Sequence, residues 1–129
     1  MFIFHSRRFL ILITIPVITI ACLFVNVEEK GKAILDSIPI YEGAKLLGES
    51  RTTYPDSTPS VIREYQSQVP ADELMAYYQS TLTEQEWSLQ VWDTSDPYVP
   101  REILAQKDGW RVSILVYSTG KFTLRVFLN

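Results

Sequence analysis

Hydrophobic and polar residues follow three patterns along this chain, and each pattern predicts a different structure. Residues 9–25 contain no charged side chain and follow Arg7 and Arg8. As a helix they would extend roughly 25 Å, close to the hydrocarbon thickness of a bilayer. Beyond residue 38, apolar residues recur either at helical spacing or in alternation with polar ones. These two patterns predict a globular domain behind an apolar N-terminal segment.

The helical pattern follows Pro70, a residue that suits the first position of a helix. Asp72 and Glu73 come next, and their charges complement the positive end of a helix dipole. Apolar residues then recur three or four positions apart and form one stripe: Ala71, Leu74, Met75, Tyr78 and Leu82. We therefore expect a helix that packs this stripe against a sheet.

Alternation between apolar and polar residues predicts six strands around this helix. Turn-forming residues separate them, and Lys107-Asp108-Gly109 predicts a tight hairpin. The expected strands span residues 45–54, 61–67, 87–92, 102–106, 110–117 and 122–128. The order is ββαββββ, an α+β fold in which one helix packs on a face of a mostly antiparallel sheet.

The chain of 129 residues is too short for two ordinary domains once the N-terminal segment is set aside. We expect residues 1–25 to be a signal-anchor or lipoprotein signal segment, the polar residues 26–37 to be a stalk with the capacity to be helical at its end, and residues 38–129 to form a single globular α+β domain.

The apolar segment is compatible with three fates. A retained transmembrane helix fits the apolar run, which continues past Cys22 to Val25. Lipidation of Cys22 fits Ile20-Ala21-Cys22, which resembles the end of a lipobox. Cleavage after Ala21 would release a secreted domain. All three imply targeting to a membrane.

The basic residues around this segment predict its orientation. Arg7 and Arg8 precede it, whereas Lys30 and Lys32 follow it among acidic residues. Positive charge is retained on the cytoplasmic side of membranes. We therefore expect the domain to lie outside the cytoplasm, on the periplasmic or extracellular side.

The charge of the domain argues against nucleic acid as a partner. From residue 33 onward the chain has 8 Lys and Arg and 13 Asp and Glu, a balance of −5. An acidic domain repels phosphate backbones. Acidic residues such as Glu102 and Asp108 balance the basic ones near the C-terminus, so no basic stripe is expected: Arg101, Arg111, Lys121 and Arg125.

Recognisable catalytic chemistry is missing from the domain sequence. The single histidine, His5, precedes the apolar segment, so no histidine-based triad or metal site can form in the domain. We therefore expect no enzyme, no cofactor and no metal site. The alternative is a histidine-free hydrolase that uses loop carboxylates, either Asp93 with Asp96 or Asp56. Aspartates in proline-rich loops more often form turns.

One set of apolar residues falls on the strand face opposite the expected core: Trp92, Leu115, Tyr117 and Phe127. Exposed apolar patches usually mark contact surfaces. We expect a binding module that contacts another protein, a second copy of itself or a small apolar ligand. The alternatives are that another segment covers this face, or that the domain is a structural spacer.

Two short motifs resemble those of uncharacterised bacterial envelope proteins with a small α+β domain. The first is residues 38–44, Ile-Pro-Ile-Tyr-Glu-Gly-Ala, which is similar to a "P-x-Y-P-G-A" entry. The second is a helix with Tyr77, Tyr78 and Leu82 that runs into Trp87. Departures from the pattern are Glu42 for its second proline and Glu86 for the glycine before tryptophan. The resemblance implies a fold and an envelope location, but no activity.

Overall fold

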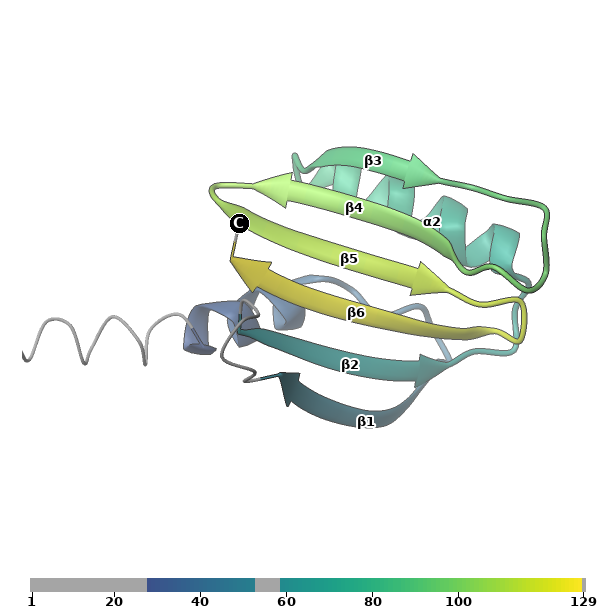
Figure 1. Cartoon of the computed structure of the whole chain (residues 1–129), viewed down its shortest axis with the longest axis horizontal. Coiled ribbons are helices and arrows are strands. Elements are labelled where there is room, and N and C mark those ends of the chain that lie inside the picture. The colour runs from purple at the N-terminus through teal and green to yellow at the C-terminus, as the bar shows by residue number, and fades with distance from the viewer. Residues whose placement is uncertain (1–27, 53–58, 129) are drawn as a thin grey trace, which may run out of the picture.

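The structure is a computed structural model that describes residues 28–52 and 59–128 (Figure 1). In these ranges the chain forms a six-stranded antiparallel sheet and two helices, α2 (Ala71–Glu84) and an unlabelled helix over residues 28–37. The strands are β1 (Lys45–Thr52), β2 (Ser60–Gln66), β3 (Ser88–Trp92), β4 (Arg101–Lys107), β5 (Trp110–Val116) and β6 (Lys121–Leu128). The predicted α+β fold is confirmed, whereas the expectation of a single helix is wrong.

The strands are ordered β1-β2-β6-β5-β4-β3 across the sheet. Strands β3 to β6 form a meander, and β6 then pairs with β2, which leads through α2 to the opposite edge. Asp108 and Gly109 join β4 to β5 with φ values of 52° and 81°. Positive φ at both central residues is what a tight type I′ hairpin requires, so this predicted turn is present.

The core lies between the sheet and the helices, and α2 supplies the predicted stripe. Leu74, Met75, Tyr78 and Leu82 are all buried, whereas Ala71 at the start of the helix is half-buried. Buried residues of the four inner strands face them: Val61, Tyr65, Ile103, Ala105, Val112, Ile114, Val116, Phe122, Leu124 and Val126. Burial of this apolar surface is the main force that holds the fold together.

The helix over residues 28–37 packs on the same face of the sheet as α2 (Figure 1). Leu35 and the following Ile38 are each only 1% exposed and belong to the core. Gly31 faces the sheet, where a Cβ would lie 3.4 Å from Val126 Cγ1 and 3.7 Å from Trp110 Cζ3, an ordinary packing distance. Part of the segment expected as a polar stalk is thus a helix docked on the sheet.

The C-terminal end of α2 turns sharply through Glu86, where φ is 67°. The Glu86 N–H donates to the Thr83 carbonyl and the Trp87 N–H to the Leu82 carbonyl, which together form a Schellman cap. Left-handed φ favours glycine at this position of the cap. The resembled pattern has glycine there, so the departure at Glu86 falls on a residue whose left-handed φ favours glycine.

Several predictions concern residues outside the described ranges. They include the apolar segment 9–25, the lipidation candidate Cys22 and most of the turn over residues 54–60. Within residues 28–52 and 59–128, no helix is long and apolar enough to cross a membrane.

Candidate functional site

One face of the sheet carries no described helix, and we call it the open face (Figure 1). It consists of the side chains that alternate with the buried ones along β2, β4, β5 and β6, with Trp92 at the edge strand. Its members are Ser60, Ile62, Glu64, Gln66, Trp92, Glu102, Leu104, Gln106, Arg111, Ser113, Leu115, Tyr117, Lys121, Thr123, Arg125 and Phe127. Ser113 and Thr123 lie at its centre and are 9% and 7% exposed, because larger neighbours cover them.

The four predicted contact residues share this face but do not touch as one patch. Trp92 is 52% exposed and pairs with Glu102, which pairs in turn with Leu115. Phe127 lies further along β6 and pairs with Arg111. Tyr117 follows β5. Charged and polar side chains therefore separate the apolar ones, and the face is mixed rather than continuously apolar.

Two arginines are diagonal neighbours on the open face, Arg111 near the start of β5 and Arg125 on β6. Each is half-buried, and the Nε atom of each is buried without a hydrogen-bond partner. The Arg125 guanidinium lies 5.0 Å from the centre of the Phe127 ring, a cation–π contact. Sequence reasoning regarded both arginines as balanced by acids, and for these two the structure shows no such ion pair among the described residues.

The acidic residues of the open face have other partners. Glu102 accepts a hydrogen bond from the Ser113 hydroxyl at 3.1 Å. Glu64 forms an ion pair with Lys121 at 3.6 Å. The alternation of apolar and polar residues in β5 and β6 is enough to predict that Arg111 and Arg125 lie on the outer face. No acid lies directly opposite either arginine, and Glu64, a diagonal neighbour of Arg125, pairs with Lys121; this follows from the strand register, which the sequence alone does not reveal.

The loop carboxylates of the hydrolase alternative have structural contacts. Asp93 Oδ1 lies 3.1 Å from Arg101 Nε, and Asp96 Oδ1 accepts a hydrogen bond from the Tyr98 N–H at 2.9 Å. The second contact is an Asx-turn, the usual role of aspartate in such loops. Asp56, the other candidate, lies outside the described residues.

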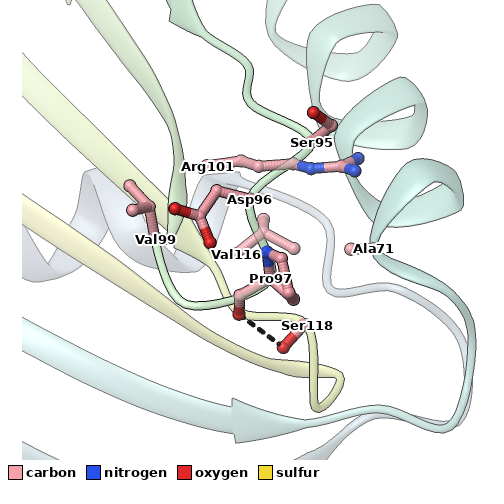
Figure 2. A pocket seen from close by; sticks show the side chains of 8 residues that line it. All are labelled: Ala71, Ser95, Asp96, Pro97, Val99, Arg101, Val116 and Ser118. Atoms are coloured by element: carbon pink, nitrogen blue, oxygen red, sulfur yellow. Dashed lines mark hydrogen bonds between the residues drawn. The ribbon is translucent and has the colours of Figure 1, made fainter.

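A pocket of about 110 Å³ lies beside this loop, between β4, the end of β5 and the start of α2 (Figure 2). The Arg101 side chain extends toward α2, where it pairs with Asp72, and the Asp96 carboxyl points the other way. The hydrogen bond to Asp72 raises the pKa of Arg101, against a smaller lowering by burial. Ligand pockets commonly reach about 300–1,000 Å³, so this one is small for a substrate site.

A second, wider groove of about 400 Å³ lies between the helix over residues 28–37 and the end of α2. Its lining residues are Ile34, Ser37, Gln85, Trp87, Lys107, Asp108 and Trp110. The polar groups here join the two helices to the sheet: Gln85 Nε2 donates to the Ser37 carbonyl at 2.9 Å, and Lys107 Nζ donates to the Gln85 carbonyl at 2.7 Å. Lys107 thereby satisfies a carbonyl at the negative end of α2.

The two motifs that carry the resemblance meet in one tyrosine cluster. The Tyr41 N–H donates to the Tyr78 hydroxyl at 3.2 Å, and the Tyr41 hydroxyl donates to Glu73 at 3.1 Å. The Tyr77 ring packs edge-on against both other rings, at 5.1 Å from Tyr41 and 5.0 Å from Tyr78. Burial raises the pKa of Tyr78, against a smaller lowering by the Tyr41 N–H. These residues fasten the segment before β1 to α2.

Neither metal ligands nor known relatives assign a chemistry to the protein. In the part of the chain that the structure describes, no three His, Cys, Asp or Glu side chains gather where they could hold a metal ion. Comparison with known protein families, curated proteins and solved structures finds no significant match. The resemblance to envelope proteins therefore stays a prediction.

Proposed function

We propose that this protein is a non-enzymatic binding module, held at a membrane by its N-terminal segment, that contacts a partner protein through the open face. The observation that carries the proposal is the asymmetry of the sheet. Two helices cover one face, and no described segment crosses the other (Figure 1). A sheet face built from aromatic, aliphatic and charged side chains needs water or a partner over it.

The size of the open face suits a protein partner. The five strands that contribute to it, about 4.8 Å apart and about seven residues long, make a face of roughly 24 Å by 23 Å. A standard interface buries about 800 Å² on each partner. The planar area, on the order of 600 Å², is comparable once the relief of the side chains is added. A small apolar ligand would cover only a fraction of it.

The composition of the open face also suits a protein partner. Aromatic residues and arginine are enriched at interfaces that form between separately folded proteins. Trp92 and Phe127 provide the aromatic surface. Arg111 lies directly opposite Phe127, and Arg125 lies two residues before Phe127 in β6. The polar residues that separate the apolar ones also keep the face soluble when no partner is bound.

The membrane part of the proposal is supported by sequence alone. Residues 9–25 are free of charge and follow Arg7 and Arg8, which favours a domain held outside the cytoplasm. Intact-mass measurement of the protein from solubilised membranes tests how it is held. A retained segment gives the full mass, lipidation at Cys22 gives a lipidated product that begins at Cys22, and cleavage gives a shorter, unmodified chain.

The binding proposal is tested with the double variant Trp92→Ser, Phe127→Ser in the full chain. Neither residue belongs to the buried core, so the melting temperature should change little. Partner binding, measured by co-purification from detergent-solubilised membranes and by light scattering for self-association, should be lost. The matched control is Tyr98→Ser, since Tyr98 is 93% exposed on the loop before β4 and lies off the open face.

The outcomes separate the proposals clearly. Loss of binding in the double variant, with binding kept in the Tyr98 control, supports a contact surface at the open face. Loss of folding in the double variant would show that these side chains are core. Unchanged association in both variants would contradict the open face as the binding site and favour a structural spacer.

A further inference from the structure

We infer that Arg111 and Arg125 form an anion-binding subsite on the open face, and that the partner places a carboxylate of an acidic peptide segment on it. This inference rests on the proposed function and specifies the chemistry of the partner. It starts from the two guanidinium groups whose Nε atoms are buried without a hydrogen bond.

The strand register brings the two arginines together. Arg111 pairs with Phe127 and Arg125 pairs with Ser113 across the β5–β6 ladder, so the arginines are diagonal neighbours on one face. Diagonal neighbours have Cβ atoms roughly 7–8 Å apart or less, and arginine side chains bridge that distance easily. One carboxylate placed between them can therefore accept hydrogen bonds from both.

Neutral residues flank both arginines across the strands. Arg125 lies between Ser113 and Ile62, and Arg111 lies between Phe127 and Gln106. Of the acids on the open face, Glu64 is a diagonal neighbour of Arg125 but pairs with Lys121, and Glu102 accepts a hydrogen bond from Ser113 and forms no ion pair with either arginine. The positive charge of the pair is thus left without a counter-ion in the described part of the chain.

The other described arginines behave differently. Arg51 pairs with Glu28, Arg63 with Asp36 and Glu49, and Arg101 with Asp72 and Asp93. The domain has more acids than bases, so counter-ions are plentiful in its composition. Arg111 and Arg125 are nevertheless left out of these pairs. The Nε atoms are enclosed by their neighbours, so an incoming carboxylate would meet the exposed part of each half-buried guanidinium and supply the missing counter-ion.

The surroundings favour a single carboxylate on a peptide over a polyanion. The domain from residue 33 onward has a balance of −5, which repels a ligand with many negative charges. Close to the arginines lie Ile62, Leu104 and Phe127, which can contact apolar side chains on either side of one acidic residue. The Arg125–Phe127 contact also holds one guanidinium in place before binding, which lowers the entropy lost on association.

The test uses the full chain in a neutral detergent, with arginine labelled for NMR of the Nε–H groups. Two synthetic five-residue peptides with blocked ends serve as probes, one with a central glutamate between leucines and one with glutamine in its place. We expect the glutamate peptide to shift the Arg111 and Arg125 signals and to bind at least tenfold more tightly than the glutamine peptide.

Variants assign the effect to the arginine pair. The double variant Arg111→Gln, Arg125→Gln should bind both peptides equally, and the control Arg51→Gln should keep the preference for glutamate. Equal binding of the two peptides by the original protein, or no binding of either, would overturn the inference. A response to inorganic phosphate or to phosphatidylglycerol vesicles, but not to the glutamate peptide, would also overturn it, because the anion would then not be a peptide carboxylate.

Failure of this inference is distinguishable from failure of the proposed function. If Phe127→Ser weakens binding of both peptides while the arginine variant changes nothing, the open face binds a partner without a carboxylate site. If neither variant alters binding, both proposals fail. Circular dichroism melts confirm that each variant is folded before its binding is compared.

Discussion

Leu124 and Arg125 are neighbours in β6, yet they lie on opposite faces of the sheet, and the two faces differ in how their polar groups are satisfied. Leu124 is 1% exposed beneath the helices, whereas Arg125 lies on the open face with its Nε buried and unpaired. The helix-covered face also contains an arginine, Arg63, but there Asp36 of the helix over residues 28–37 and Glu49 of β1 pair with it. The covered face therefore satisfies its charges internally.

The difference shows which part of the molecule depends on something outside it. On the covered face, apolar side chains interlock and polar groups such as the Tyr78 hydroxyl have partners within the chain. On the open face, the Nε groups of Arg111 and Arg125 have no hydrogen-bond acceptor among the described residues. Evolution of a fold alone would not require such a pair, because neutral polar residues would keep the face equally soluble.

The largest expected effect comes from truncating a leucine on each face. Leu124→Ala should lower the free energy of unfolding by about 3 kcal/mol, because it leaves a cavity in a packed core. Leu115→Ala, on the open face and half-buried, should lower it by about 1 kcal/mol or less. Urea unfolding followed by circular dichroism measures both values.

Equal losses of stability in the two leucine variants would contradict the difference between the two faces, since they would show that Leu115 is packed as tightly as Leu124. The melting of each variant should also be checked at two protein concentrations. A larger loss for Leu115→Ala at high concentration alone would indicate that a second copy covers the open face.

A smaller effect is expected from the pH dependence of Tyr78 on the covered face. Burial raises the pKa of its phenol above the ordinary value of about 10. Above that pH the phenol ionises in the unfolded chain while it stays protonated in the folded one, so unfolding becomes more favourable as pH rises. Its contribution to stability is complete below about pH 10 and is lost as the pH rises toward the folded-state pKa.

The variant Tyr78→Phe isolates this contribution. Its stability relative to the original protein should be constant between about pH 7 and 9 and should then improve by up to about 1.4 kcal/mol per pH unit above pH 10. The constant difference at neutral pH reports the hydrogen bond that the Tyr41 N–H donates. Parallel curves for the two proteins over the whole range would mean that the phenol is accessible to water.

The sequence predicted the two faces better than it predicted what covers them. Alternation and helical spacing identified α2 and all six strands, because those patterns arise within each element. The helix over residues 28–37 was expected only as the end of a polar stalk, and its packing on the sheet was not predicted, since only Ile34, Leu35 and Ile38 mark its buried side and charged residues surround them. Its docking brings Gly31 next to Val126, a contact between distant segments that no local pattern predicts.

Part of the candidate site was likewise predictable from patterns within single strands, and part was not. The outward positions of Trp92, Leu115, Tyr117 and Phe127 follow from alternation within single strands. The unpaired arginines required knowledge of the neighbours across strands, which depends on β6 lying between β2 and β5. Pairing of β2 with β6 places Ile62 beside Arg125, where a different register would have placed an acid such as Glu64.

Substituting one arginine on each face should change the free energy of unfolding least, and the two substitutions should differ from each other. Arg63→Met should lower stability by about 1 kcal/mol, since it leaves Asp36 without its partner and leaves Glu49 with Lys32 alone, at 3.8 Å. Arg111→Met should change stability by less than about 0.5 kcal/mol in either direction, because methionine keeps the apolar stem and removes an unsatisfied donor. Urea unfolding at low and high salt measures both.

A loss for Arg111→Met as large as that for Arg63→Met would show that Arg111 has a partner within the chain. An unchanged stability would instead indicate that Arg111 serves no structural purpose in the isolated protein, as expected of a residue kept for an external contact.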